Sequence, residues 1–211
     1  MQAIRVHHFG DVDALVVEDV PRPAPGEGEV LLRVKAAGVG PWDALIRSGH
    51  SVLPQPLPLT PGSDVSGLVE EVGVGISQFH VGDAVFGATN ARFTGGYAAY
   101  AIAVAAKLAK MPQRLGFIDA ASIPVVACTA WQMVFEHGAV DRTKRVIVHG
   151  AAGNVGAYAV QLAKRVAREV IATARSDSLA YVRTLGADRV IDIQTALWPR
   201  PGPVTFRCSV S

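Results

Sequence analysis

Short apolar runs separated by glycine- and proline-rich turns make up the first half of the chain. Two turn-rich segments stand out between them, the connector PRPAPG at residues 21–26 and the pair Gly82-Asp83. The six runs of strand length are residues 3–7, 14–20, 30–36, 65–72, 84–86 and 97–103. Short strands at this spacing predict a small β-barrel or sandwich.

Helical spacing replaces the strand pattern at residue 117. Between residues 117 and 138, polar start positions precede an apolar stretch, and Pro124 interrupts the pattern. We interpret this segment as the hinge between two domains. The expected organisation is a mainly β domain at residues 1–120, a second domain at 121–193 and an atypical tail at 194–211.

The second domain alternates strand and helix patterns. A β-branched run at residues 145–149 stops at Gly150. The elements that follow are, in order, an apolar helical face, a second run at 170–174, a second helix with Ser176 or Asp177 as its N-cap and Gly186 at its end, and a third run at 190–193. This βαβαβ order predicts one mononucleotide-binding half of a Rossmann domain, a doubly wound parallel sheet.

The turn after the first of these runs has the sequence of a dinucleotide-binding loop. Residues 150–156, GAAGNVG, fit the A-x-G-x-x-G variant of the dinucleotide fingerprint. Gly153 would let the backbone approach a pyrophosphate, and Gly156 would let helix and strand pack closely. A glycine-rich turn of an unrelated α/β protein is the alternative, which the flanking pattern disfavours. The predicted cofactor-binding residues of the turn are Gly150, Ala151, Ala152, Gly153, Asn154, Val155 and Gly156.

The end of the second run bears on which dinucleotide binds. A site for NAD usually has an acidic residue there, whereas this chain has Ala174, Arg175 and Ser176. An arginine and a hydroxyl without a carboxylate suit a 2′-phosphate, so these three residues predict NADPH (NADP) as cofactor. The alternative is that Arg175 is a solvated turn residue.

Composition excludes several classes of partner. With 50% hydrophobic residues, 18% charged residues and a formal net charge of +2, the chain is globular and has no basic stripe, so we expect no nucleic acid partner. The uncharged stretch 146–163 has nearly the length of a membrane span, but its glycines and polar residues fit a phosphate loop. The N-terminus lacks the apolar core of a signal peptide, and Cys128 and Cys208 suit a reducing compartment. We therefore expect a cytoplasmic protein without a membrane partner.

The tail differs from the rest of the chain. Residues 194–211 hold three prolines together with Trp198, Phe206 and Cys208, without a period. A complete dinucleotide fold has about six strands, and only three fit the pattern, so we expect this sequence to hold about half of a cofactor domain. An open apolar sheet edge invites association, which makes a homo-oligomer one expectation.

Several motifs together carry a family resemblance. They are AAGV at 36–39, WDALIRSG at 42–49, PGSDVSG at 61–67, VEEVG at 69–73, VGDAV at 81–85, TAW at 129–131 and HGAAGNVG at 149–156. From about residue 3 to 193 the chain resembles the zinc-independent quinone oxidoreductase branch, the zeta-crystallin-like enzymes, of the medium-chain dehydrogenase/reductase superfamily. The resemblance implies a GroES-like β-barrel domain followed by an incomplete Rossmann domain.

The resemblance also implies a reaction. Such enzymes transfer hydride from NADPH to a small-molecule substrate, a quinone or an α,β-unsaturated carbonyl. The candidate catalytic residues are Trp42, Asp43 and Leu45, near the nicotinamide and substrate, and Thr129 would contact the carboxamide end of the cofactor. The family has a tyrosine where this chain has Leu45 and an asparagine at Gly40, and both departures argue against a side-chain proton donor. Asp43 is equally interpreted as a buried cap that shapes its loop.

No metal is predicted. Zinc-dependent relatives have a cysteine where this chain has Gly40, a histidine where it has Ser63 and a third ligand near Val125. Residues 88–95 hold no cysteine, so the structural zinc loop is absent too. The six histidines are scattered without ligand spacing.

Two functional hypotheses therefore stand side by side. The first is an NADPH-dependent, zinc-independent oxidoreductase. The second is a truncated, catalytically inactive family member that acts at most as a dinucleotide- or partner-binding module. The tail separates them, because an intact enzyme should show three more βα units after residue 193.

Overall fold

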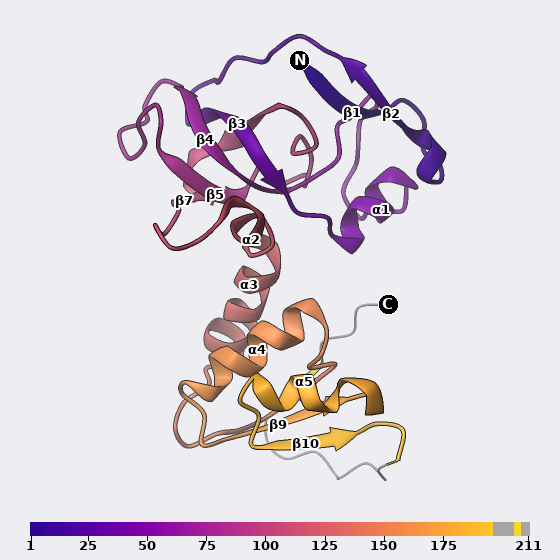
Figure 1. Ribbon diagram of the computed structural model, residues 1–211, viewed down its shortest axis with the longest axis vertical. Coiled ribbons are helices and arrows are strands. Elements are labelled where there is room, and N and C mark those ends of the chain that lie inside the picture. Colours follow the sequence, from indigo (N-terminus) through magenta and orange to yellow (C-terminus); the bar gives the residue numbers. More distant parts are fainter. Residues whose placement is uncertain (196–204, 208–211) are drawn as a thin grey trace. The chain divides into compact units, whose positions relative to one another are not determined.

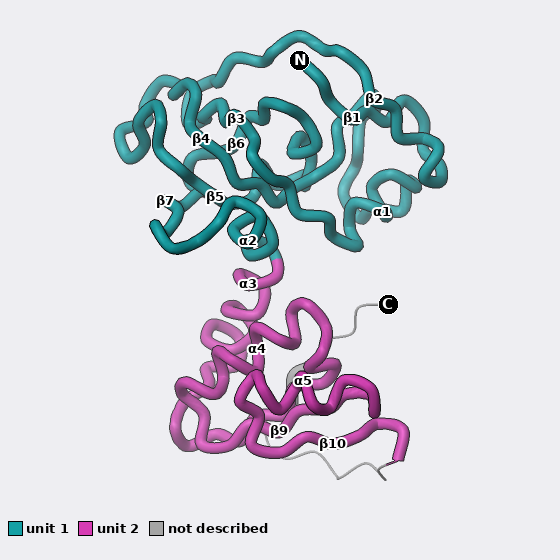
Figure 2. Tube along the Cα trace, in the orientation of Figure 1, with its two compact units in different colours: residues 1–125 teal, residues 126–211 magenta. Residues whose placement is uncertain are grey.

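The computed structural model describes residues 1–195 and the backbone of residues 205–207. The chain divides into two compact units, Met1–Val125 and Val126–Ser211 (Figures 1 and 2). The domain boundary expected from the sequence, at residue 120, stays a prediction. It falls five residues before the division between the units, within helix α2 (Phe117–Ala121).

Unit 1 is built on a five-stranded antiparallel sheet. Its strands lie in the order β6 (Tyr100–Val104), β3 (Glu29–Ala37), β4 (Asp64–Val72), β5 (Ala84–Ala88) and β7 (Leu108–Lys110). Alternate residues of β3 and β4 enter one apolar core, as period-2 patterning requires. The fully or almost fully buried residues of this core are Val30, Leu32, Val65, Val69, Phe79, Val85, Ala103 and Ala105.

The N-terminal segment forms a second, smaller layer of unit 1. Strands β1 (Gln2–Val6) and β2 (Leu15–Asp19) pair antiparallel, and the 3-10 turn η1 (Val12–Ala14) connects them. Val6 packs with Ile46 of helix α1 (Pro41–Arg47) and with Leu59 in a separate cluster. This cluster holds α1 against the N-terminal strands.

Two elements of unit 1 are absent from the sequence-based expectations. The segment of helix α1 contributes a family motif, WDALIRSG, but was not predicted to be helical. Pro41 at its first position and Asp43 at its third are nevertheless helix-start signals. Strand β7, preceded by the 3-10 turn η2 (Ala105–Lys107), has three residues, too few for a period to be visible. Its pairing with β5 decides its conformation.

The segment expected to be helical is divided as predicted at Pro124. Helix α2 ends at Ala121, and helix α3 (Pro124–Trp131) begins with the proline, whose missing N–H costs nothing at a first helical position. The continuation, η3 (Gln132–His137), is also helical, with π-helical hydrogen bonding.

Unit 2 is a four-stranded parallel sheet in the order β10, β9, β8, β11. The strands are β8 (Arg145–His149), β9 (Glu169–Ala174), β10 (Arg189–Asp192) and β11 (Thr205–Arg207). Helix α4 (Asn154–Lys164) connects β8 to β9, and the 3-10 turn η4 (Ser176–Ser178) with helix α5 (Leu179–Thr184) connects β9 to β10. In chain order the sheet reads third, second, first, fourth, which is the first part of the Rossmann strand order.

The core of unit 2 lies between the sheet and its helices. Val146 and Val148 of β8 and Val170 of β9 share one buried cluster with Val160 and Ala163 of α4. The stretch 146–163 is therefore divided between a strand, a turn and a helix. Within the described part of the chain, no helix combines the length and the apolar character needed to cross a membrane.

Strand β11 corrects one expectation. The sequence predicted three strands in unit 2, yet residues 205–207 add a fourth, parallel to β8. A three-residue strand shows no period, whereas the free backbone groups at the edge of β8 offer it hydrogen-bond partners. The edge expected to invite another chain is thus paired within the chain itself. Trp198 and Cys208 lie outside the described residues.

Candidate functional site

Asp43 is the centre of a buried polar cluster in unit 1. Its side chain is 6% exposed at the start of α1. One carboxylate oxygen accepts hydrogen bonds from the backbone N–H of Gly40 (2.7 Å) and from the hydroxyl of Tyr97 (2.9 Å). The other accepts one from the N–H of Gly62 (3.3 Å). These bonds tie three segments of unit 1 to one carboxylate.

Burial changes the acid strength of this cluster. Loss of solvation raises the pKa of the Asp43 carboxyl, although its three hydrogen bonds act in the opposite direction. Burial and the neighbouring carboxylate of Asp43 raise the pKa of the Tyr97 hydroxyl. Tyr97 is therefore a hydrogen-bond donor at neutral pH, and Asp43 is the acceptor.

Trp42 occupies the space beside Gly40. A Cβ atom built on Gly40 would overlap the six-membered part of the Trp42 indole, so a larger residue cannot coexist with this indole position. The indole also contacts Phe93, with ring centroids 6.2 Å apart. Its Nε1 is buried and has no hydrogen-bond partner among the described residues.

The three predicted catalytic residues therefore differ in environment. Trp42 is half-buried, Asp43 is buried, and Leu45 is 50% exposed. All three belong to α1, and Trp42 and Leu45 are three positions apart, so their side chains leave the helix on the same side. The helix thus presents an aromatic and an aliphatic side chain together, with the carboxylate facing the protein interior.

Asp64 is a second buried carboxylate. It is 4% exposed, and its Oδ1 accepts hydrogen bonds from the N–H of Val125 (3.2 Å) and the hydroxyl of Ser63 (3.5 Å). Burial, and to a smaller extent the charge of Asp43, raise the pKa of the Asp64 carboxyl to about 6. The backbone oxygen of Asp64 accepts from Gly38, in the loop before α1. Asp64 therefore joins that loop to the first turn of α3.

The positions of zinc ligands in zinc-dependent relatives are all in unit 1. Gly40 and Val125 have no ligating side chain, and the buried hydroxyl of Ser63 points to Asp64. A catalytic zinc needs three nitrogen, sulfur or carboxylate ligands. The residues present do not fit this ion, and residues 1–195 contain no group of three or more His, Cys, Asp or Glu that could hold a metal.

A cavity of about 540 Å³ lies elsewhere in unit 1. Arg5, Gln55, Asn90, Arg92 and Tyr100 are among the residues that line it, and none of the predicted site residues does. Arg5 already contacts Glu18 (3.4 Å), Pro58 and Thr60. This cavity is therefore separate from Trp42, Asp43 and Leu45.

In unit 2 the fingerprint turn has the geometry that its glycines require. Gly150 directly follows β8 and has a φ of 67°, in the left-handed region that favours glycine. A Cβ atom on Gly156 would overlap the carbonyl oxygen of Gly150, which accounts for a glycine on this face of α4. A Cβ atom on Gly153 would meet only that same oxygen, at 3.3 Å. The fold thus needs Gly156 far more than Gly153.

The start of α4 is open to a ligand. Gly153 is the N-cap, and both Gly153 and Asn154 are exposed. The first N–H groups of a helix have no partner inside the helix and carry partial positive charge, so this terminus can bind an anion. Ala151 is fully buried and Val155 is half-buried against the core of unit 2.

Thr173 is a residue of this turn that sequence reasoning missed. Its buried hydroxyl accepts a hydrogen bond from the N–H of Gly150 (3.4 Å) and lies 3.3 Å from Nδ1 of His149. Its backbone oxygen accepts from Ala151 (3.0 Å). The sequence signal for Thr173 is a hydroxyl within the apolar run 170–174, and the pairing of β8 with β9 brings that hydroxyl to the turn.

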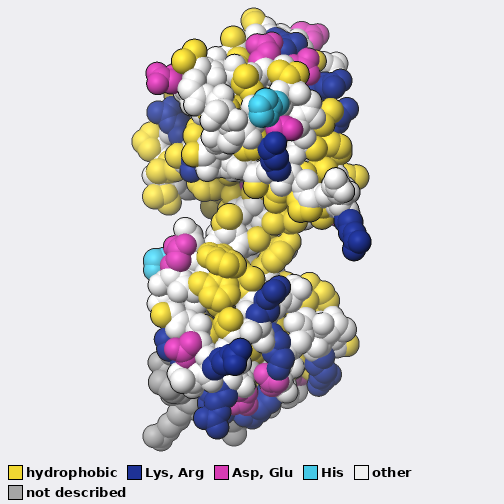
Figure 3. Space-filling model, turned by 90° about the vertical axis from the view of Figure 1, so that its left-hand side faces the viewer, with side chains coloured by type: hydrophobic (Ala, Val, Ile, Leu, Met, Phe, Trp, Pro, Cys, Tyr) yellow, Lys and Arg dark blue, Asp and Glu magenta, His cyan; other side chains and the backbone are white. Residues whose placement is uncertain are grey.

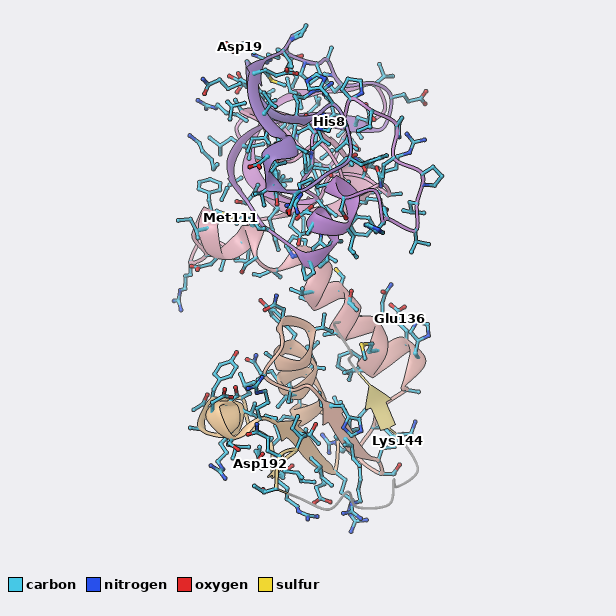
Figure 4. The ribbon with its side chains drawn as sticks, turned by 90° about the vertical axis from the view of Figure 1, so that its right-hand side faces the viewer. His8, Asp19, Met111, Glu136, Lys144 and Asp192 are labelled. Atoms are coloured by element: carbon cyan, nitrogen blue, oxygen red, sulfur yellow. The ribbon has the colours of Figure 1, made fainter. Side chains whose placement is uncertain are left out.

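The end of β9 also differs from expectation. Arg175 is exposed, with its Nε 3.9 Å from the carboxylate of Asp177. Ser176 or Asp177 was the predicted helix N-cap, but α5 begins after η4 with Ser178 as its N-cap, and the hydroxyl of Ser176 lies 2.6 Å from Oδ2 of Asp192. Asp177 is the carboxylate next to Ser176 in the sequence, whereas Asp192, labelled in Figure 4, comes beside Ser176 only through the pairing of β10 with β9.

Thr129 lies within α3, half-buried, between exposed Cys128 and buried Ala130. Apolar side chains cover much of this helical segment (Figure 3), and Trp131 and Phe135 form an aromatic pair with centroids 4.3 Å apart. Thr129 is therefore positioned by a helix with an apolar surface, and its contact with the carboxamide stays a prediction.

Known proteins share this architecture. The family model of the alcohol dehydrogenase GroES-like domain matches residues 26–113, within unit 1. A quinone oxidoreductase from Lama guanicoe is 42% identical over 178 residues, which cover 84% of this chain and 53% of the relative. The chain thus spans about half the length of the curated relatives it matches.

Solved structures agree with the sequence comparison. The quinone oxidoreductase from Coxiella burnetii has a TM-score of 0.84 at 32% identity, covering 93% of this chain and 63% of that one. The Escherichia coli quinone oxidoreductase complexed with NADPH has a TM-score of 0.82 at 28% identity, covering 93% and 60%. The predicted GroES-like domain and partial Rossmann sheet are confirmed, and over most of its length the chain is similar to quinone oxidoreductases.

Proposed function

We propose that this chain binds NADPH and serves a zinc-independent oxidoreductase that reduces a quinone or an α,β-unsaturated carbonyl. The observation that carries the proposal is the fingerprint turn, with its left-handed Gly150, its open helix start and the close approach at Gly156. Two relatives support it. The Escherichia coli quinone oxidoreductase is complexed with NADPH, and the relative at 42% identity is a quinone oxidoreductase by name.

The residues of unit 2 fit a dinucleotide in type and position. The start of α4 would hold the pyrophosphate. The hydroxyl of Thr173 would hold the turn in place, since it accepts a hydrogen bond from the N–H of Gly150. Ala174, Arg175 and Ser176 would surround the adenosine ribose, and Thr129 would contact the carboxamide. NADPH, when bound, supplies the hydride.

The residues of unit 1 would position the substrate rather than transfer protons. Asp43 is occupied by three hydrogen bonds, which supports the interpretation that it is a cap of α1. Trp42 and Leu45 would then provide an apolar wall for a flat, electron-poor acceptor. Since neither side chain titrates, proton delivery to the product would come from solvent.

Zinc independence is part of the proposal. Gly40, Ser63 and Val125 offer no ligand set for the ion, so electrophilic help would have to come from hydrogen bonds. A cytoplasmic location and association with a second copy of the chain also remain proposals. Size-exclusion chromatography with light scattering tests the association.

The first experiment is a titration of the 211-residue chain with NADPH and with NADH, followed by nicotinamide fluorescence. We expect saturable binding that is tighter for NADPH, and oxidation of the bound cofactor when a simple quinone is added. Binding without oxidation would favour the alternative, a dinucleotide-binding module without turnover. The absence of binding to either cofactor would contradict the proposal.

A further inference from the structure

The strand register of unit 2 brings a carboxylate to the end of β9. Asp192 is the last residue of β10 and pairs with Ala174, the last residue of β9. Its Oδ2 accepts the hydroxyl hydrogen of Ser176 (2.6 Å), and its Oδ1 accepts the N–H of Gln194 (2.9 Å). The carboxylate is therefore fixed at two oxygens, beside the residues expected to surround the adenosine ribose.

The charges around this point oppose one another. The Ser176 hydroxyl and the Gln194 N–H lower the pKa of the Asp192 carboxyl, so the group is ionised at neutral pH. Arg175 supplies one positive charge, but its side chain is 68% exposed and lies near the equally exposed Asp177. The carboxylate of Asp177 thus offsets part of this positive charge.

The Ser176 hydroxyl has only one hydrogen to donate. Two acceptors lie 2.6 Å from it, Oδ2 of Asp192 and Oε1 of Gln194, and a hydrogen directed to either is not available to a phosphate oxygen. A ribose 2′-hydroxyl could instead donate to Asp192, whereas a 2′-phosphate brings a charge of about −1.5 to −2 toward a fixed carboxylate. The carboxylate of Asp192 would therefore attract a ribose 2′-hydroxyl and repel a 2′-phosphate.

We propose that Asp192 determines cofactor specificity: it lowers the affinity for nucleotides with a 2′-phosphate relative to those with a 2′-hydroxyl, and thereby opposes Arg175. This inference rests on the proposed function, since it assumes that the adenosine ribose binds at the end of β9. It predicts a moderate preference for NADPH that removal of one carboxylate would enlarge.

The test uses ligands that carry only the adenosine half of the cofactor. Calorimetry measures the binding of 2′,5′-ADP and of 5′-AMP to the full chain and to Asp192→Asn, with NADPH and NADH as second probes. We expect Asp192→Asn to raise the affinity ratio of 2′,5′-ADP over 5′-AMP by roughly three- to tenfold at low salt, with a smaller gain in about 0.5 M salt.

The matched control is Asp141→Asn. Asp141 precedes β8, so it lies at the amino ends of the parallel strands, opposite Asp192, and an asparagine can keep its hydrogen bonds with Thr143. The substitution changes the net charge by the same amount and should leave the ratio unchanged. Asp192→Ser is the second variant if the first fails to fold, as judged by circular dichroism.

The outcomes separate the inference from the proposed function. An unchanged ratio in a folded Asp192 variant that still binds the nucleotides overturns the inference and leaves the proposed function standing. An equal gain in Asp141→Asn also overturns it, because net charge alone would then explain the effect. If the wild-type chain binds none of the four ligands, both fail.

Discussion

The indole of Trp42 lies over Gly40, in the space where a side chain at that position would begin. Gly40 has a φ of −111°, which any residue can adopt, so its backbone does not require glycine. Glycine is required at this position because the indole ring of Trp42 fills the space that a Cβ atom would occupy. A single aromatic residue thus excludes the cysteine or asparagine that relatives of this family carry at the same position.

Replacing Gly40 with alanine should therefore destabilise unit 1. The added methyl group must displace the indole, which is expected to lower the free energy of unfolding by about 1–3 kcal/mol. Urea denaturation followed by tryptophan fluorescence measures the change. In a Trp42→Ala background the same substitution should cost almost nothing, because the obstructing ring is gone.

The control for this prediction is Gly116→Ala. Gly116 is also a helix N-cap with an ordinary φ of −75°, and a Cβ atom there would lie 3.6 Å from its nearest neighbour, in Asp119. Its cost should be well below that of Gly40→Ala. Similar costs for both variants, or a cost at Gly40 that persists without Trp42, would contradict the steric explanation.

Alanine substitutions at Gly153 and Gly156 should affect different properties: one should weaken cofactor binding and the other should lower stability. Gly156→Ala places a methyl group against the Gly150 carbonyl and should cost roughly 2–3 kcal/mol of stability in unit 2. Gly153→Ala meets only a loose contact at 3.3 Å, so it should cost less than about 1 kcal/mol yet weaken NADPH binding. Thermal unfolding and nicotinamide fluorescence measure the two effects. Unaltered NADPH affinity in Gly153→Ala would argue against the pyrophosphate position.

Asp64 should make the stability of unit 1 depend on pH. Burial raises its folded-state pKa to about 6, above an unfolded value of about 3.9. The folded state therefore binds the proton more tightly, and the stabilisation is complete below about pH 4 and is lost as pH rises through about 6. After allowance for solvent screening, we expect a loss of about 1–2 kcal/mol over this window.

Asp64→Asn tests this dependence, because an amide oxygen can still accept from Val125 and does not titrate. Urea denaturation of both proteins between about pH 3.5 and pH 7.5 gives the difference in stability at each pH. The advantage of the wild type over the variant should shrink from about pH 4 to pH 6. Parallel curves would show that Asp64 has an ordinary pKa. Asp43, whose pKa is also raised, is present in both proteins.

Tyr97→Phe should weaken the cluster around Asp43. The substitution removes the hydroxyl that donates to the buried carboxylate at 2.9 Å, which typically costs about 1–3 kcal/mol. Tyr100→Phe is the matched control, since phenylalanine keeps the ring under Arg22 and removes a hydroxyl that is not bonded to the Asp43 cluster. Chemical denaturation of the two variants gives the comparison. Equal stabilities would mean that the Tyr97 hydroxyl contributes nothing to the cluster.

The hydrophobic pattern and the motifs of the sequence predicted much of the secondary structure and the order of its elements. The strand runs of unit 1, the break at Pro124 and the βαβαβ order of unit 2 follow from hydrophobic period and from residues that end helices or strands. Gly186, expected at the end of a helix, has a φ of 99° just after α5, because local backbone geometry alone demands glycine there. These are properties of neighbours in sequence.

The tertiary structure decided what distant residues do to one another. Asp192 reaches Ser176 only because β10 pairs with β9, and Thr173 supports the fingerprint turn only because β9 pairs with β8. Strand β11 exists because an adjacent edge offers hydrogen bonds, and both carboxylate oxygens of Asp43 are bonded because Tyr97 and Gly62 fold onto them. The spacing of residues along the sequence does not predict such contacts. Hydrogen bonds and charge interactions depend on distances of a few ångströms between atoms, and the packing of the whole unit sets those distances.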